Sequence, residues 1–71
     1  MAVEMQYVSS SAISAIGYDA EEKEMHVQFK SGGLHIYEEV KQATFDALVN
    51  ADSVGSYFHK HIRDKFDSRQ A

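Results

Sequence analysis

The stretch that decides the fold reads Met25-His26-Val27-Gln28-Phe29-Lys30-Ser31-Gly32-Gly33-Leu34-His35-Ile36-Tyr37, and it has the pattern of a β-hairpin. Before the turn, apolar and polar residues alternate, which is typical of a strand with one buried face. Gly32 and Gly33 supply the positive-φ positions of a tight turn, and residues 34–37 carry the chain back. A hairpin alone is only marginally stable in water, so the rest of the chain must cover its apolar face.

The turn of this hairpin permits two registers. A two-residue turn pairs Phe29 with Ile36 and leaves His35 and Tyr37 outside the core. A three-residue turn that begins at Ser31 pairs Phe29 with His35 and turns positions 35 and 37 inward, because a slip of one residue exchanges the two faces. The number of apolar residues favours the first register, and the pattern alone leaves the choice open.

The flanking segments complete a small α+β domain. Residues 12–18 read as a first strand in simple alternation, and the polar link 19–23 is short enough to place it antiparallel to the next strand. Apolar residues then recur at helical spacing over 41–50, and Ser53 is a candidate N-cap for a second helix that continues to about Phe66. We therefore expect a two-layer sandwich: a three-stranded antiparallel sheet followed by two helices packed on one face (βββαα).

Length and composition restrict the class of protein. The 71 residues predict one domain over 8–67, with a flexible N-terminus at 1–7 and a flexible C-terminus at 68–71. The absence of cysteine excludes disulfides and thiolate zinc sites. We expect no signal peptide and no membrane partner, since no stretch approaches the roughly 20 apolar residues of a membrane span. The expected product is soluble and cytoplasmic.

Charge is distributed unevenly along the chain. The net charge is −4, but residues 1–52 hold three basic and nine acidic side chains, whereas residues 53–71 hold four basic and two acidic ones. The overall acidity argues against a broad nucleic-acid-binding surface. The charge balance of the last segment nevertheless allows a local basic face on the second helix.

Several spaced residues resemble the KTSC domain. The matching runs are Ser10-x-Ala12-Ile13-x-Ala15-Ile16-Gly17-Tyr18-Asp19, Val27-x-Phe29-x-Ser31-Gly32, Tyr37-x-x-Val40 and Ala51-x-Ser53-x-Gly55-x-Tyr57-Phe58-x-x-x-Ile62-Arg63. This small module occurs at the C-terminus of some lysyl-tRNA synthetases and as a free-standing bacterial protein. The similarity covers about residues 8–66, which is nearly the whole chain.

The chain departs from this family pattern at two positions. The central Tyr-x-Tyr motif of the family reads His35-Ile36-Tyr37 here, and the proline that many relatives have after the position of Val40 is replaced by Lys41. The family pattern implies that positions 35 and 37 share a face directed toward the helices. Attachment to a synthetase implies RNA, and tRNA in particular, as the partner of the domain, although the activity of the family is not established.

The candidate nucleic-acid-binding residues gather around the second helix. Basic side chains could contact phosphates, backbone amides at the start of the helix could bind an anion, and rings could stack on bases. Tyr18 is a further ring that could serve in stacking if an open sheet face lies nearby. A solvated helix face and an ordinary capping turn explain the same pattern. The candidates are Lys60, Arg63, Lys65, His59, Gly55, Ser53, Tyr37 and His35.

Other chemistry is weakly indicated. His59 and His61 point about 200° apart on a helix and cannot share an ion, while His26 and His35 could approach across the hairpin but lack a defined third ligand. No nucleophile is placed beside a base, and the serine run at 9–11 reads as turn chemistry. A chain this short should have little room for a pocket of ~300 Å³ or more. We therefore expect no enzyme, no metal, no cofactor and no small-molecule substrate.

Two functions are compatible with these observations. The first is a non-catalytic module that binds RNA through its basic C-terminal helix. The second is a protein-interaction or self-association module without a nucleic-acid role, in which sheet edges or an uncovered sheet face bind a host protein or a second copy of the chain.

Overall fold

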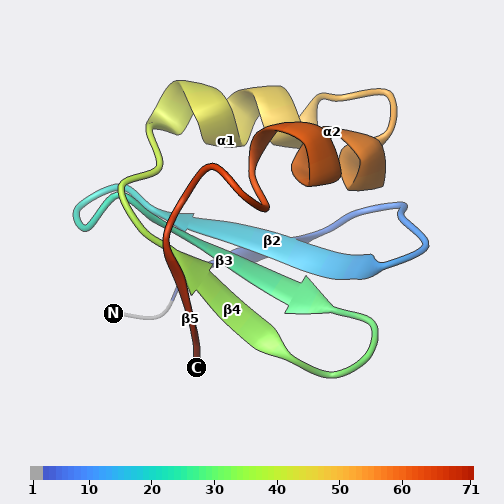
Figure 1. Ribbon diagram of the computed structural model, residues 1–71, viewed down its shortest axis with the longest axis horizontal. Coiled ribbons are helices and arrows are strands. Elements are labelled where there is room, and N and C mark those ends of the chain that lie inside the picture. Colours follow the sequence, from blue (N-terminus) through green and yellow to red (C-terminus); the bar gives the residue numbers. More distant parts are fainter. Residues whose placement is uncertain (1–2) are drawn as a thin grey trace.

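Residues 3–71, which the computed structural model describes, form two layers: an antiparallel sheet and two helices that cover one of its faces (Figure 1). The elements in chain order are β1 (Met5–Tyr7), β2 (Ile13–Asp19), β3 (Glu24–Phe29), β4 (Leu34–Tyr37), α1 (Gln42–Val49), α2 (Val54–His61) and β5 (Ser68–Gln70). The strands lie in the sheet in sequence order. Neither of the described helices has the length and apolar character needed to cross a membrane.

The prediction of an α+β domain with two helices on one face of an antiparallel sheet is confirmed, but the expected number of three strands is wrong. β1 and β5 extend the sheet at its two edges. Both lie in the segments 1–7 and 68–71, which the sequence places outside the domain. Each has only three residues with mostly exposed side chains, so no alternation of burial marks it in the sequence. Met1 and Ala2 lie outside the described residues.

The central hairpin adopts a register that differs from both alternatives. Met25 pairs with Tyr37 and Val27 pairs with His35, so both aromatic rings of β4 lie on the helix-facing side. The inward face implied by the family pattern is therefore confirmed, and the register favoured by apolar residues is wrong. The number of apolar residues favoured the wrong register because Ile36 is buried on the face of the sheet that points away from the helices.

A three-residue loop over Lys30–Gly32 closes this hairpin. The amide of Phe29 donates to the carbonyl of Gly33 at 2.9 Å, and the amide of Gly32 donates to the carbonyl of Phe29 at 3.0 Å. Only Gly32 of the two turn glycines has a positive φ, at 106°. The pairing of Phe29 with His35 in the longer predicted turn is thus also wrong, since the loop starts one residue earlier.

A bulge in β2 interrupts the simple alternation expected for this strand. Ile13 pairs with Phe29, whereas Ala15 pairs with Gln28, so one extra residue of β2 is inserted between the two pairs. A bulge of this kind shifts the following side chains to the other face. Ile13 and Ile16 therefore both reach the core cluster under the helices.

The helices are held to the sheet by aromatic packing. Phe58 of α2 meets Phe29 and Tyr37 at ring-centroid distances of 5.6 and 5.4 Å, with interplanar angles of 71° and 86°. Phe45 of α1 stacks on Tyr18 at 5.2 Å, and the Tyr18 hydroxyl donates to the carbonyl of Val40. Edge-to-face contacts of this kind add stability beyond the burial of area. They fix α2 above β3 and β4, and α1 above β2.

The second helix is shorter than the sequence predicts. Ser53 is its N-cap as expected, because the Ser53 side chain accepts the amide of Ser56 at 3.3 Å. The helix ends at His61 instead of Phe66. The carbonyl of Phe58 accepts the amides of both Ile62 and Arg63, which turns the chain so that Ile62 is fully buried and β5 can return to the sheet edge.

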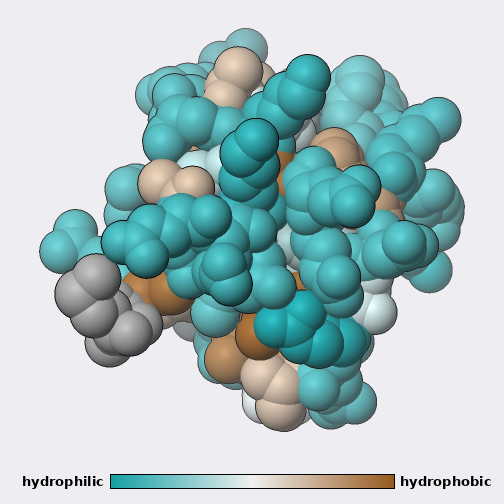
Figure 2. Space-filling view, turned by 90° about the vertical axis from the view of Figure 1, so that its left-hand side faces the viewer, coloured by the Kyte–Doolittle hydropathy of each residue, from teal (hydrophilic) through white to brown (hydrophobic). Residues whose placement is uncertain are grey.

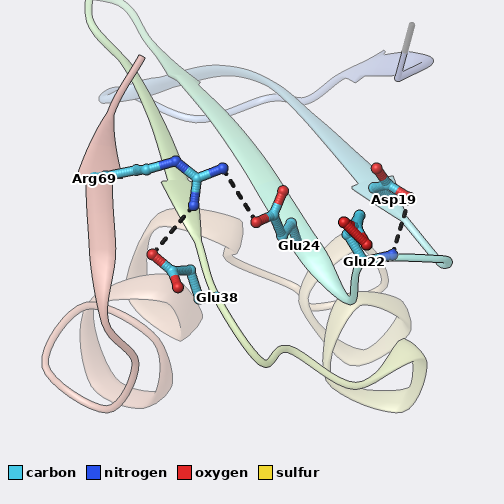
Figure 3. Close-up of polar contacts among 5 residues, drawn as sticks. All are labelled: Asp19, Glu22, Glu24, Glu38 and Arg69. Carbon is cyan, nitrogen blue, oxygen red and sulfur yellow. Dashed lines mark hydrogen bonds and ion pairs between the residues drawn. The ribbon is translucent and has the colours of Figure 1, made fainter. Parts of the chain in front are cut away.

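Polar contacts secure β5 and the loop between β2 and β3 (Figure 3). Arg69 of β5 reaches across the outer face of the sheet and forms ion pairs of 3.1 Å with Glu24 and with Glu38. In the neighbouring loop, Oδ1 of Asp19 accepts the amides of Glu21 and Glu22. These exposed ion pairs guide the C-terminal strand to β4 more than they stabilise the fold.

The hairpin turn yields a prediction that separates its two glycines. Gly32→Ala should lower the free energy of unfolding by about 1–2 kcal/mol, because an L side chain is strained at positive φ. Gly33→Ala is the matched control, since a β-carbon there would meet only ordinary contacts of 3.5 Å or more. Urea denaturation of both variants measures the difference, and equal losses would contradict the observed turn.

A second prediction concerns the anchor of α2. Phe58→Ala should cost about 3–5 kcal/mol in the free energy of unfolding, since it removes a buried ring from contact with two others. Phe66→Ala, at a half-buried ring on the edge of the core, should cost clearly less. Thermal or chemical denaturation compares the two, and a Phe58 variant as stable as the Phe66 variant would refute the packing described.

Candidate nucleic-acid interface

A polar groove lies at the end of the molecule where α2 begins, which is the right-hand end in Figure 1. We call it the serine groove, and its volume is about 850 Å³. The loop between β1 and β2 forms one side, the start of α2 the other, and Lys30 of the β3–β4 loop contributes an ammonium group. Its polar lining comprises Ser9, Ser10, Ser11, Lys30, Asp52, Ser53, Ser56, His59 and Lys60.

Local hydrogen bonds explain why these serines adopt this arrangement. The Oγ atom of Ser10 accepts the amides of Ala12 and Ile13, each at 3.3 Å, which confirms the turn chemistry expected for the serine run. Ser53 accepts an amide in the same way as the helix N-cap. A serine that accepts through its oxygen still holds a hydroxyl proton to donate. The groove therefore presents hydroxyl donors on both sides.

Gly55 brings the two sides of the serine groove together. A β-carbon at this position would lie 3.0 Å from Oγ of Ser10, closer than nearly all such contacts. Glycine therefore lets the serine loop pack on the first turn of α2. The first amides of a helix have no partner within the helix, and here the amide of Ser56 is capped by Ser53.

The charges of the molecule are separated between its two ends. Lys30 and Lys60 line the serine groove together with a single carboxylate, Asp52. The opposite end carries more acidic than basic side chains: Glu21, Glu22, Glu38 and Glu39 are accompanied by Lys23 and Lys65. Figure 2 views the molecule from this opposite end, and hydrophilic side chains dominate the face it shows. An anionic ligand is therefore favoured at the groove and disfavoured at the far end.

A second hollow, of about 450 Å³, opens between α2 and the β3–β4 hairpin. We call it the aromatic cavity, because Phe29, His35, Tyr37 and Phe58 form its walls. The His35 ring meets the edge of Phe29 at a centroid distance of 5.2 Å. The aromatic cavity and the serine groove share lining residues, so the two form one continuous concave surface.

Two polar features mark the aromatic cavity. Burial raises the pKa of Tyr37 above the usual 10.0, although Ser68 and Arg63 act in the opposite direction, so the phenol keeps its proton at neutral pH. Arg63 lies beside His59, with its Nη1 atom 3.3 Å from Nδ1 and 3.2 Å from Nε2 of the imidazole. Both side chains line the cavity, which therefore combines apolar walls with a guanidinium group.

The structure brings together most of the site residues predicted from the sequence. Of these residues, His35, Tyr37 and Arg63 line the aromatic cavity, Ser53 and Lys60 line the serine groove, and Gly55 and His59 line both, as does Ala12. Lys65 is separate, in a small polar hollow that it shares with acidic side chains. Tyr18 is also separate, because its ring is packed against α1.

The expectation that the chain has little room for a pocket of ~300 Å³ or more is wrong, since both hollows exceed this volume. Lys30, Ser10 and Phe29 also line the site, and none of them is among the residues predicted from the sequence. Lys30 had a usable signal, because a lysine in a hairpin turn is brought to the end of the sheet. The other two read only as turn and core residues, and their place in the site depends on where α2 packs.

Within residues 3–71, no hydrogen bond links a serine side chain to a histidine. The Oγ atoms of Ser10 and Ser53 accept backbone amides instead. His26 and His35 lie on opposite faces of the sheet, so the pairing considered for a metal ion does not form. In that part of the chain no three potential metal-binding side chains gather at one place.

Comparisons with known proteins agree with this geometry. The KTSC domain model matches residues 9–66. A protein of Tsukamurella paurometabola is 39% identical over 62 residues, which cover 87% of this chain and 92% of that protein. A lysine–tRNA ligase of Trichormus variabilis is 35% identical over 60 residues, which cover 84% of this chain but 11% of the ligase.

The fold is also known from experiment. The crystal structure of a KTSC domain protein from Yersinia pestis superposes with a TM-score of 0.94, is 34% identical and covers 99% of each chain. The family match spans most of the residues, including both sides of the serine groove and the hairpin of the aromatic cavity. By sequence and by fold, the chain belongs to the KTSC domain family.

Proposed function

We propose that this protein is a non-catalytic RNA-binding module and that the serine groove holds the RNA backbone. The observation that carries the proposal is the convergence of Lys30 and Lys60, from opposite sides, on one groove of an otherwise acidic protein. The two lysines are 30 residues apart in the sequence and belong to different layers of the fold. The match to part of a lysine–tRNA ligase supports tRNA as the class of RNA.

The chemistry of the serine groove fits a phosphate. Ammonium groups supply charge, and hydroxyl and backbone amide groups supply hydrogen-bond donors; these are the groups that bind phosphate oxygens in nucleic-acid complexes. The start of α2 adds a positive dipole end. Asp52 is the one carboxylate in the lining, so two ammonium groups face one negative charge. The net positive charge of the groove is therefore small, and it suits contact with one or two phosphates of an RNA strand.

This proposal changes which lysines matter. The sequence alone treats Lys60 and Lys65 as equivalent members of a basic helix, yet α2 ends at His61 and Lys65 lies beyond it. Lys65 shares its hollow with Glu38 and Glu39, which offset its charge. The RNA-binding surface therefore runs across the start of α2 to the β3–β4 loop, and it does not follow the C-terminal segment.

Substitution of the groove lysines tests the proposal. Lys30→Gln and Lys60→Gln should each weaken binding of a tRNA, and each should reduce the log–log salt slope by about 0.7–1, because one phosphate contact is lost. Fluorescence anisotropy at several salt concentrations measures both quantities. Lys65→Gln is the matched control and should change neither. The proposal fails if the wild-type protein does not bind RNA at low salt, or if Lys65→Gln has the same effect as the groove variants.

A second function, self-association, is favoured by one observation at the β1 edge of the sheet. Tyr7 of β1 is 88% exposed and is the one exposed large hydrophobic side chain among the residues described. β1 is an edge strand, and edge strands present unpaired backbone groups that a second copy can bind. Self-association through β1 would leave the serine groove open, so the two functions are compatible.

Light scattering over a dilution series tests this second function. A self-associating chain should change from dimer to monomer on dilution, and Tyr7→Ser should favour the monomer because it removes apolar area from the contact. Gln6→Ser, at the neighbouring exposed position of β1, is the control and should have a smaller effect. A wild-type protein that remains monomeric at high concentration would rule out this interface.

A further inference from the structure

We infer that the aromatic cavity binds one unstacked nucleobase, so that the module recognises single-stranded RNA; this inference rests on the proposed function. The cavity and the serine groove are joined at Gly55 and His59, which line both. A nucleotide whose phosphate lies in the groove would therefore have its base at the entrance of the cavity. The surface matches the two parts of a nucleotide in both position and chemistry.

The walls of the cavity fit a flat ring. Phe29 and Phe58 stand nearly perpendicular to each other, at 71°, and His35 meets Phe29 at 87°. Phe58 and Tyr37 are buried, whereas Phe29 and His35 are half-buried, so an inserted ring can reach the accessible parts of Phe29 and His35 and meet them face to face or edge to face. Volume is also adequate, because about 450 Å³ lies within the range of small-ligand pockets.

The charge at the cavity favours an aromatic ring that is attached to an anion. Arg63 lines the cavity and its guanidinium group lies in contact with the His59 ring, so one positive charge stands on the α2 side of the opening. An aliphatic side chain of a protein partner would gain nothing from a guanidinium group, and an aromatic one would gain only a cation–π contact. A nucleotide gains twice, through its phosphate and through stacking of its base on the guanidinium plane.

The shape of the surface excludes duplex RNA from this contact. Bases in a helix are stacked and paired, and the cavity walls are side chains from the sheet and from α2 that admit only a ring that leaves its stack. Hydrogen-bonding groups inside the cavity can meet the edge of such a base. The polar side chains of Ser31 and His35, which line the cavity, can supply them.

The test compares His35→Ala with a conservative variant. His35→Ala should weaken binding of a single-stranded RNA nonamer about tenfold, which is the usual loss when one stacking side chain is removed. His35→Phe keeps a flat ring and should retain affinity within about twofold. His61→Ala removes an exposed histidine of α2 that packs on Tyr57 outside the cavity, and it should have no effect. Circular dichroism confirms that each variant is folded.

The same assay with two further ligands separates this inference from the proposed function. The nonamer in duplex form should bind the wild-type protein more weakly, and a nonamer with abasic sites should bind the wild type and His35→Ala equally. If His35→Ala matches the wild type on the base-bearing strand while Lys60→Gln remains weakened, the cavity inference is wrong and the backbone groove stands. If no RNA binds at low salt, the proposed function itself fails.

Discussion

The packing of Phe58 between Phe29 and Tyr37 is the contact on which the rest of this structure depends. It joins the last helix to the central hairpin, and in doing so it fixes where α2 begins. The position of that first turn decides which side chains meet across the serine groove. A buried aromatic contact with no charge of its own therefore sets the distance between basic groups from two layers of the fold. Core and site are parts of one arrangement here, because the aromatic rings that close the core also form the walls of the cavity.

The local patterns in the sequence were enough to predict the fold class, the two helices on one face and the capping role of Ser53. They could not predict the edge strands, since β5 is polar and fully exposed and exists only through its pairing with β4. They also misjudged the hairpin, because Ile36 is buried on the outer face and alternation alone cannot reveal a second covered face. The bulge between Ile13 and Ala15 could not be predicted either, because one extra residue in a strand does not change the composition of the strand.

The sequence predicts most residues of the candidate site, but it does not predict how these residues are arranged in space. Residues on or near α2, such as His59 and Lys60, were recognised from charge and helical position. Lys30 was missed because its place opposite α2 depends on the packing of one layer on the other. Lys65 is among the predicted residues because the pattern predicts a helix that continues to about Phe66. The helix ends earlier, where the carbonyl of Phe58 accepts hydrogen bonds from the amides of both Ile62 and Arg63. In each case the missing information was tertiary: which segments meet, and where a helix must stop for the chain to return.

The two ends of the molecule differ in their balance of charge. Glutamates outnumber lysines at the end with the β2–β3 loop, whereas lysines outnumber carboxylates in the groove, so the proposed function places a polyanion at the groove. The most direct measurement is a nuclear magnetic resonance titration of the 15N-labelled protein with single-stranded RNA at low salt. The account predicts amide shifts concentrated at residues 9–12, 30–35 and 53–63, with the segment 20–24 unaffected. Shifts centred on 20–24, or none at any RNA concentration, would contradict it.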